Sequence, residues 1–303
     1  MNRKEFLKSG VGAAALAMMA PSIIGRGLRR DKPSYKSDFR LALKFSMVED
    51  DKMSILDKFK MLKDIGFDGT ELDSPNDFNN KEIIEARDKT GLIIPSVICS
   101  KHWTYPLSSP DPQVRATCVE AMKTALNDCK DYGGTSVLLV PAVVNKDMSY
   151  DDAYKRSQDE IRKLLPVARD TGVKIAVENV WNNFLLSPLE AARYIDEFND
   201  PMIGWHFDIG NIVRYGWPEQ WIHILNKRIL KLDVKGYSRK KEKEEGLDHG
   251  FDVEIGNDDN NWPAVIQALN DIGYDGWASA EVKGGDRNRM EEIFGEMKNV
   301  FRG

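Results

Sequence analysis

The stretch VKIAVENVWNNFLLSPLEAARYIDEFNDPMIGWHFDIGN, residues 173–211, contains the pattern that decides the fold. Its runs 173–178 and 202–208 are short, mostly apolar and rich in β-branched and aromatic residues, as buried strands are. The segment between them follows a helical period from Ser187, and Glu190 stands three residues later, which is the capping-box spacing of a helix start. A strand, a helix and a second strand predict two parallel strands joined by a helical crossover.

The same alternation extends over the rest of the chain from residue 38. Strands are expected at 39–46, 67–72, 92–98, 135–140, 173–178, 202–208, 228–234 and 276–281. Helices are expected at about 53–65, 79–90, 111–131, 150–170, 187–199, 218–225, 261–272 and 287–301. Eight such units predict an α/β fold, a closed (β/α)₈ TIM barrel that forms a single domain over residues 38–303. The alternative is an open doubly wound sheet, but no glycine-rich phosphate fingerprint follows the first strand.

The residues before this barrel follow a different pattern. Arg3 and Lys4 precede an apolar run of small residues at 11–20, which is the order of a secretory signal peptide. The run is too short to span a bilayer as a helix. We therefore expect an export signal at 1–24, a linker at 25–37, a periplasmic location and no stable membrane anchor after processing.

The route of export is left open by the sequence. Residues 2–8, NRKEFLK, resemble a bacterial twin-arginine signal, but Lys4 stands at the second arginine position. An ordinary amphipathic helix at the start of the chain is the alternative interpretation.

Charge and cysteine content argue against several classes of protein. The net charge is −5 with both signs mixed along the chain, whereas a nucleic-acid-binding domain is strongly basic. Cys99, Cys118 and Cys129 have no metal-binding spacing. Cys118 and Cys129 fall on one expected helix about three turns apart, too far for a disulfide. We therefore expect all three cysteines to be buried, small apolar residues.

Chemistry is expected at the carboxyl ends of the strands, where the active sites of such barrels lie. Four carboxylates occupy those positions: Glu178, Asp208, Asp233 and Glu281. Acids crowded at one barrel mouth repel one another, and a divalent cation removes this repulsion. An all-oxygen set suits Mn²⁺ or Mg²⁺ better than it suits metals that prefer thiolates. The alternative is that these acids cap the following helices or pair with lysines such as Lys235.

Alternation along a strand indicates what lies beside these acids, because residues two apart share a face. If Asp208 points into the barrel, His206 does too, one layer deeper. We interpret His206 as supporting the site rather than as a direct ligand. If Asp233 points inward, so do Lys231 and Lys235. Lys235 is then expected to contact a substrate oxygen or to hold Asp233.

Several of these motifs resemble a known group of enzymes. They are SVICSKH (96–102), AVEN (176–179), FDIGN (207–211), LDVK (232–235) and the tail 261–281. Over about residues 40–300 the sequence resembles the sugar isomerases and epimerases with a xylose-isomerase-like barrel, a group that includes endonuclease IV. It is most similar to L-ribulose and L-xylulose 5-phosphate 3-epimerases, D-tagatose 3-epimerase-type enzymes and hydroxypyruvate isomerases.

The resemblance implies roles for individual residues. In the group, the positions matching Glu178, Asp208 and Glu281 bind a metal ion, and the two glutamates also act as the acid/base pair. The usual third ligand is a histidine in a His-x-Lys-Asp motif, where this chain has Asp233, so the site is more acidic. Mn²⁺ is expected first, with Mg²⁺, Co²⁺ and Zn²⁺ as alternatives. Arg239 resembles an arginine that contacts sugar or phosphate oxygens in relatives.

A further set of side chains is expected around the substrate. The residues expected to bind it are Glu71, His102, Asn211, Lys235 and Arg239. The aromatic candidates for apolar walls against a sugar ring are Phe45, Trp103, Trp181 and Trp217. Aromatic residues are more often part of the packing, which is the alternative for each of the four.

Together these features predict a metal-dependent sugar isomerase or epimerase that acts through an enediolate on a ketose or keto-sugar. Glu178 and Glu281 would remove a proton from the carbon beside the carbonyl and return one to the opposite face or to the neighbouring carbon. Export favours a free sugar, a keto-sugar or a glycoside, since sugar phosphates are mainly cytoplasmic. The expected partner is a small sugar; a homo-oligomer is left open, and nucleic acid is not expected.

Three other functions compete with this prediction. An exported lyase that splits 3-keto-glycosides would use the same metal site and the same proton abstraction. A non-catalytic sugar-binding barrel would bind without turnover. An enzyme like endonuclease IV needs a histidine-rich zinc cluster and a basic surface, which four histidines and a net negative charge argue against.

Overall fold

The computed structural model describes residues 38–303. The export signal expected at 1–24 and the linker expected at 25–37 lie outside these described residues. Among the helices within residues 38–303, none is both long enough and apolar enough to cross a membrane.

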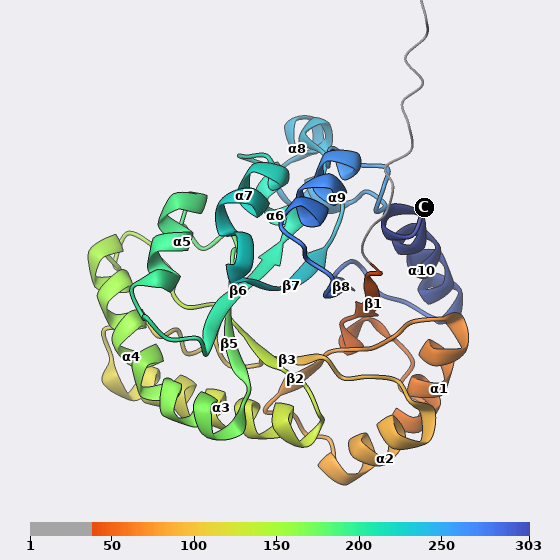
Figure 1. The fold of residues 1–303 in the computed structure, drawn as a ribbon, viewed down its shortest axis with the longest axis horizontal. Helices are drawn as coiled ribbons and strands as arrows, with labels where there is room; N and C mark the ends of the chain where they lie inside the picture. Colours follow the sequence, from red (N-terminus) through yellow and green to blue (C-terminus); the bar gives the residue numbers. More distant parts are fainter. Residues whose placement is uncertain (1–37) are drawn as a thin grey trace, which may run out of the picture. The chain divides into compact units, whose positions relative to one another are not determined.

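The described strands form one parallel eight-stranded sheet in the order β1-β8-β7-β6-β5-β4-β3-β2. They are β1 (Arg40–Leu43), β2 (Leu72–Ser74), β3 (Ser96–Cys99), β4 (Ser136–Leu139), β5 (Lys174–Glu178), β6 (Ile203–Asp208), β7 (Ile229–Val234) and β8 (Trp277–Ala280). The backbone N–H of Glu71 donates to the Leu43 carbonyl at 2.9 Å, and Lys44 and Glu71 form a parallel bridge, so the sheet closes between β1 and the residues before β2. The strands therefore surround a central axis, with the helices outside them, as the predicted TIM barrel requires (Figure 1).

The helices connect successive strands. They are α1 (Ile55–Ile65), α2 (Asn80–Thr90), α3 (Pro112–Asp131), α4 (Tyr150–Thr171), α5 (Pro188–Asp196), α6 (Ile209–Val213), α7 (Pro218–Leu225), α8 (Arg239–Glu245), α9 (Trp262–Asp271) and α10 (Arg287–Phe301). The expected cap of α5 is present, because Ser187 Oγ accepts the backbone N–H of Glu190 at 3.2 Å. Gly172 follows α4 with φ 72°, a left-handed conformation that ends a helix and that glycine adopts without a Cβ clash.

Two helices differ from the sequence-based expectations, and side-chain caps explain both. Every residue of the segment 239–245, RKKEKEE, is charged, a composition typical of a solvated loop, but the segment forms α8, because Ser238 Oγ accepts the Lys241 N–H at 3.3 Å. The short helix α6 starts directly after β6, because Asp208 Oδ1 accepts the Asn211 N–H at 2.8 Å. Such caps satisfy N–H groups that have no partner within the helix.

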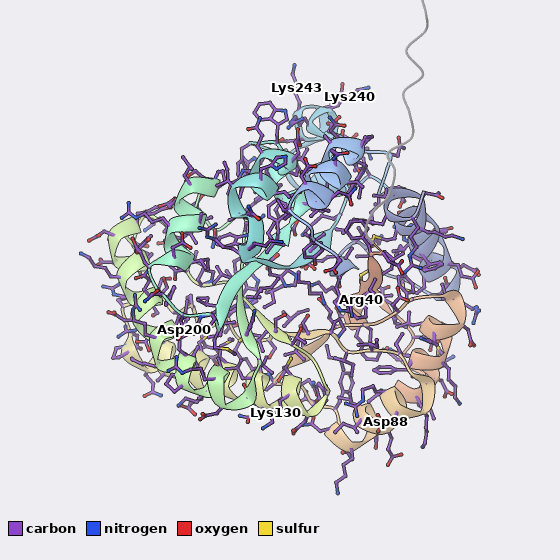
Figure 2. The ribbon with its side chains drawn as sticks, in the orientation of Figure 1. Arg40, Asp88, Lys130, Asp200, Lys240 and Lys243 are labelled. Carbon is purple, nitrogen blue, oxygen red and sulfur yellow. The ribbon has the colours of Figure 1, made fainter. Side chains whose placement is uncertain are left out.

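The core lies between the sheet and the surrounding helices. Ile175 and Val177, on the face of β5 opposite to Glu178, are buried in it. The three cysteines are free and buried, as predicted. The labelled side chains of Asp88, Lys130, Lys240 and Lys243 lie at the periphery of the molecule (Figure 2).

Candidate active site

Four carboxylates meet at the carboxyl ends of neighbouring strands. Glu178, Asp208 and Asp233 lie on β5, β6 and β7, and Glu281 directly follows β8. One ligand atom from each of the four lies within 4.8 Å of the others. Glu178, Asp208 and Asp233 are buried. Parallel strands end at the same edge of a sheet, so acids separated by up to about a hundred positions in the chain become neighbours.

Asp208 is held by backbone groups as well as by a lysine. Its Oδ1 caps α6, and its backbone N–H donates to Asn179 Oδ1 at 3.1 Å. The Asn211 side chain donates to the Asn179 carbonyl at 3.0 Å and ties the ends of β5 and β6 together. One oxygen of Asp208, Oδ1, therefore caps a helix, as the alternative interpretation of these acids predicts. Its other oxygen, Oδ2, remains directed at the acidic cluster.

Lys235 lies between two of the four acids. Its Nζ is 2.8 Å from Asp208 Oδ2 and 2.5 Å from Glu281 Oε2. The alternative in which the acids pair with a lysine is thus also partly realised. The expectation that Lys235 holds Asp233 is not met, because its contacts are to the two neighbouring acids.

Asp233 is held by two other buried groups. Lys44 Nζ lies 2.7 Å and His206 Nε2 lies 2.9 Å from Asp233 Oδ1. His206 is fully buried beside Asp233, in agreement with the deeper position inferred from alternation. Among the described residues, Asp233 Oδ2 has no hydrogen-bond partner. A buried carboxylate oxygen without a partner is costly, and a bound cation would satisfy it.

Glu71 lies deeper in the barrel than expected for a substrate-binding residue. Its carboxylate forms ion pairs with Lys44 Nζ, at 2.6 Å, and with Lys231 Nζ. It also accepts hydrogen bonds from Ser96 Oγ at 2.8 Å and Ser279 Oγ at 3.0 Å. Both carboxylate oxygens are engaged within the core. Lys231 points inward, as the alternation predicts, and its partner there is Glu71.

The electrostatics of the cluster follow from burial and from crowding of like charges. Burial, together with Glu281, Asp233 and Asp208, raises the pKa of Glu178 well above its usual range. Burial also raises the pKa of Asp208 to about 7, against the opposing effect of Lys235. Burial alone would raise the pKa of Asp233, but His206 and Lys44 outweigh it and hold this pKa below its usual range.

The donor set fits a divalent cation. Four carboxylates face two ammonium groups, those of Lys44 and Lys235, which leaves a charge of −4 + 2 = −2 when all are ionised. A divalent cation would balance this charge. The unpartnered oxygen of Asp233 and the all-oxygen composition point to the hard ions named from the sequence. The residues that would hold the ion are Glu178, Asp208, Asp233 and Glu281.

Two cavities open beside this cluster. Cavity A, of about 310 Å³, has both polar and apolar lining residues: Lys44, Ser46, Asp73, Ser100, His102, Glu178 and Glu281, and Met47, Ile98, Cys99, Trp103, Leu138 and Val282. Cavity B, of about 260 Å³, is lined by Trp103, Val180, Trp181, Asn211, Lys235 and Phe251 together with the same two glutamates. Three of the five residues expected to bind substrate therefore line a cavity: His102, Asn211 and Lys235. Glu71 and Arg239 line neither cavity.

Arg239 is engaged elsewhere. It begins α8, is exposed, and donates a guanidinium N–H to the Gly216 carbonyl at 2.9 Å. Its guanidinium lies 5.8 Å from the ring centre of Trp217. Trp217, at 56% exposed, and the buried Phe45 do not line either cavity, whereas Trp103 and Trp181 do.

His102 offers a defined donor to cavity A. Its Nδ1 accepts the Val140 backbone N–H at 3.2 Å. Burial and the neighbouring Lys44 lower the pKa of His102 to about 3, so the ring is neutral at ordinary pH. A neutral ring that accepts at Nδ1 carries its proton on Nε2. That N–H can donate to a ligand oxygen.

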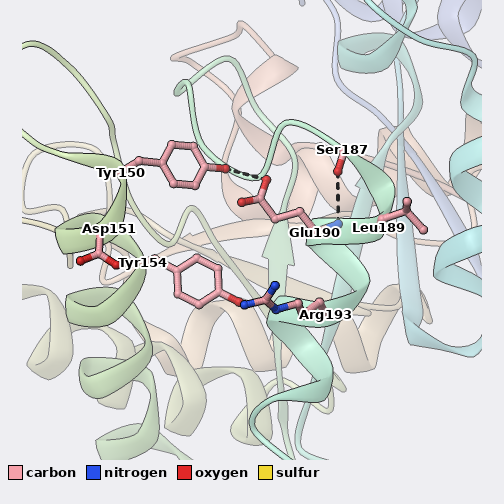
Figure 3. A pocket seen from close by; sticks show the side chains of 7 residues that line it. All are labelled: Tyr150, Asp151, Tyr154, Ser187, Leu189, Glu190 and Arg193. Atoms are coloured by element: carbon pink, nitrogen blue, oxygen red, sulfur yellow. Dashed lines mark hydrogen bonds between the residues drawn. The ribbon is translucent and has the colours of Figure 1, made fainter.

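A separate hollow lies on the outside of the barrel between α4 and α5 (Figure 3). Tyr150 Oη donates to Glu190 Oε2 at 2.6 Å there, and Ser187 caps α5. These polar groups connect two helices to each other. The hollow contains none of the four clustered acids.

Lys44 is a site residue that the sequence analysis missed. It directly follows β1 and is buried, and its ammonium group contacts both Glu71 and Asp233. A signal was present, because Lys44 directly follows the apolar run 41–43 of the first strand, at the same kind of position as the four acids. Asp73, within β2, also lines cavity A.

A closed parallel barrel with acids and cavities at the carboxyl ends of its strands defines a TIM-barrel protein with a candidate metal centre at the usual active-site position of this fold. The sequence profile of the xylose isomerase-like TIM barrel family matches residues 59–301, and the chain belongs to this family.

Several proteins similar to this chain are sugar epimerases. L-ribulose-5-phosphate 3-epimerase UlaE of Escherichia coli O1:K1 is 27% identical over 168 residues, which cover 52% of this chain. The match spans 59% of the length of that relative. A D-tagatose 3-epimerase-like protein superposes with a TM-score of 0.72 at 22% identity, covering 87% of this chain and 98% of that one. The 3-keto-D-glucoside 4-epimerase YcjR of E. coli superposes with a TM-score of 0.73 at 17% identity, covering 88% and 100%. Both of these solved structures have the same fold as this chain.

Proposed function

We propose that this protein is a metal-dependent sugar isomerase or epimerase that acts on a free ketose or keto-sugar through an enediolate. One observation carries the proposal: Glu178 and Glu281 belong to the four-acid cluster and also line both cavities. Two carboxylates that reach both a cation and a ligand can transfer protons next to a polarised carbonyl. The sugar epimerases among its relatives make this chemistry the first candidate.

The two glutamates would exchange the proton of the reacting carbon. One carboxylate removes a proton from the carbon beside the carbonyl, and the other delivers a proton to the opposite face or to the adjacent carbon. Burial favours the protonated form of Glu178, which suits a group that must hold and return a proton. A divalent cation, when bound by the four acids, would stabilise the negative charge that develops on the substrate oxygens.

Other side chains would orient the sugar. The His102 N–H at Nε2 is available to a hydroxyl or carbonyl oxygen in cavity A. Lys235 lies beside Glu281 in cavity B, where it can orient that carboxylate and donate to a substrate oxygen. Trp103 and Trp181 supply apolar surface against a ring.

The test is solvent-proton exchange. The Mn²⁺-loaded protein is incubated in D₂O with a panel of free ketoses and keto-sugars, and deuterium beside the carbonyl is measured by NMR. We expect metal-dependent incorporation by the native protein, and a loss of at least about a hundredfold in Glu178→Gln and Glu281→Gln. Leu189→Ala, at an exposed position on α5, is the matched control. Native-like exchange in both glutamine variants would refute the assignment of the acid/base pair.

A lyase that splits 3-keto-glycosides is the second candidate, and the presence of two cavities favours it. The same proton abstraction would be followed by cleavage of the C–O bond to the leaving group, whose oxygen takes the electron pair and a proton. Release of free leaving group from a keto-glycoside, alongside deuterium exchange, separates the lyase from an epimerase. We also propose that residues 1–24 direct export, so that the barrel meets free sugars rather than sugar phosphates.

A further inference from the structure

Cavities A and B share three residues. Trp103, Glu178 and Glu281 line both, while every other lining residue belongs to one cavity only. The proposed acid/base pair therefore lies at the junction of two hollows rather than at the bottom of one. Trp103, which follows β3 and is 52% exposed, contributes to the walls of both hollows.

Each cavity has its own chemistry. Cavity A combines polar groups, from Asp73, Ser100 and the N–H of His102, with apolar side chains such as Ile98 and Leu138, and this mixture suits a sugar ring, which has both hydroxyl groups and C–H faces. Cavity B has an aromatic wall, because Trp181 and Phe251 lie with ring centres 4.8 Å apart. The Trp181 indole N–H donates to the Asn211 carbonyl at 2.9 Å, which fixes this wall in place.

Their volumes set the size of the ligand. At about 310 and 260 Å³, each cavity lies near the lower end of small-molecule pockets, roughly 300–1,000 Å³. Each can take one ring-sized group, and a ketose alone would leave one of them to water. A ligand that fills both displaces that water and buries more of its own surface.

From this arrangement we propose that the substrate has two parts: a keto-sugar ring in cavity A and a second ring, joined to it by a glycosidic bond, against the aromatic wall of cavity B. The inference rests on the proposed enediolate chemistry and replaces the free sugar by a glycoside of a keto-sugar as the substrate. Because the proton-transferring glutamates lie at the junction, the carbon that loses its proton is close to the bond that joins the two parts. The second ring is a sugar or an aromatic group, since both present an apolar face to Trp181 and Phe251.

The experiment compares ligands that differ only in the second part. Deuterium incorporation by the Mn²⁺-loaded protein is measured for 3-keto-D-glucose and for its methyl, phenyl and glucosyl β-glycosides. We expect kcat/KM for the phenyl or glucosyl compound to exceed that of the free sugar by tenfold or more, with the methyl compound near the free sugar. Equal kcat/KM values for all four ligands would overturn the proposal.

Variants locate the second part. Val180→Trp fills cavity B, and we expect the advantage of the phenyl glycoside over the free sugar to fall at least tenfold. Phe251→Ala removes part of the aromatic wall and should lower the ratio of kcat/KM for the phenyl glycoside to kcat/KM for the free sugar. This second variant tests the assignment even if Val180→Trp does not fold. Leu189→Trp, on the outside of α5, is the matched control. An unchanged ratio in both folded cavity B variants would overturn the assignment.

A binding measurement separates this inference from the proposed function. Calorimetry with D-glucose and with phenyl β-D-glucoside, which carry no ketone, reports binding without chemistry. Tighter binding of the glucoside, together with no exchange on any keto-sugar, would refute the enediolate chemistry and retain the two-part site. Exchange on the keto-sugars with no preference for a second ring would support the enediolate chemistry and refute the two-part site.

Discussion

Lys44 Nζ lies 2.7 Å from Asp233 Oδ1, and both side chains are almost completely buried. The same ammonium group lies 2.6 Å from Glu71 Oε2, so one lysine bridges an acid of the four-acid cluster and an acid of the barrel interior. Lys44 therefore offsets part of the negative charge of the four-acid cluster, and His206 Nε2 contacts the same oxygen of Asp233 at 2.9 Å.

Removal of this cation should destabilise the metal-free protein. Lys44→Met leaves Glu71 and Asp233 without their shared partner, and we expect the free energy of unfolding to fall by about 3–5 kcal/mol. Mn²⁺ should restore part of the loss, because it replaces the missing positive charge. Denaturant unfolding with and without metal measures both effects. Lys146→Met, at a side chain that is 88% exposed, is the control and should change stability by less than about 0.5 kcal/mol. Equal stabilities of the two variants would show that the pair is not needed.

Metal binding should depend on the charge of Asp208. Asp208→Asn keeps an oxygen that can cap α6 but loses the negative charge, so the fold should persist while Mn²⁺ affinity drops by more than about a hundredfold. Calorimetric titration and bound-metal analysis, with circular dichroism to check the fold, test this. Unchanged metal content in the variant would contradict the site assignment.

Metal affinity should also rise with pH. Burial raises the pKa of Asp208 to about 7, so below this value the metal-free carboxyl carries a proton that the cation must displace. The apparent Mn²⁺ affinity should increase by up to about tenfold per pH unit for each displaced proton and level off above about pH 7 to 8. Glu178, whose pKa is also raised, adds to the same trend. Titrations in buffers of different ionisation enthalpy count the protons released; no release between pH 6 and 7 would contradict the expectation.

Lys235 should compete with the metal. Its ammonium group lies against Asp208 and Glu281, and a cation held by those acids would be repelled by it. Lys235→Met should therefore bind Mn²⁺ about tenfold more tightly, yet exchange substrate protons more slowly, because the group that orients Glu281 is gone. Parallel measurements of Kd for Mn²⁺ and of deuterium incorporation separate the two effects. Weaker metal binding would mean that Lys235 supports the site rather than competing with the ion.

The export signal can be tested directly. Expression of the full chain in a diderm bacterium should yield a periplasmic protein that lacks about residues 1–24, detected by intact mass and N-terminal sequencing of each cell fraction. Deletion of this segment should leave the barrel in the cytoplasm. A full-length protein confined to the cytoplasm would refute the signal. Arg3→Gln removes the one arginine of the segment 2–8 that resembles a twin-arginine signal. Loss of export in this variant would indicate the twin-arginine route, and unchanged export would indicate the general secretory route.

The sequence by itself determined the barrel and the four acids. Short, mostly apolar runs alternate with helical runs, and each acid ends such a run. Strand ends and acids could therefore be predicted together without knowledge of distant contacts. Burial of Lys231 and His206 followed from the same alternation, since Asp233 and Asp208 fix the inward face. Local patterns of this kind depend only on neighbours in the chain.

Only the tertiary structure decided what each of these groups touches. Glu71 is engaged by lysines from β7 and from the end of β1, and Lys235 pairs with Asp208 and Glu281 rather than with Asp233. The division of the mouth into cavities A and B also depends on side chains from six or more separate strand ends and loops. Such contacts depend on the register between strands that are far apart in sequence. Which groups form ion pairs depends on the distances between them once the barrel has closed. The sequence pattern predicts which face of a strand each residue lies on, but it does not predict which residue lies opposite it across the barrel.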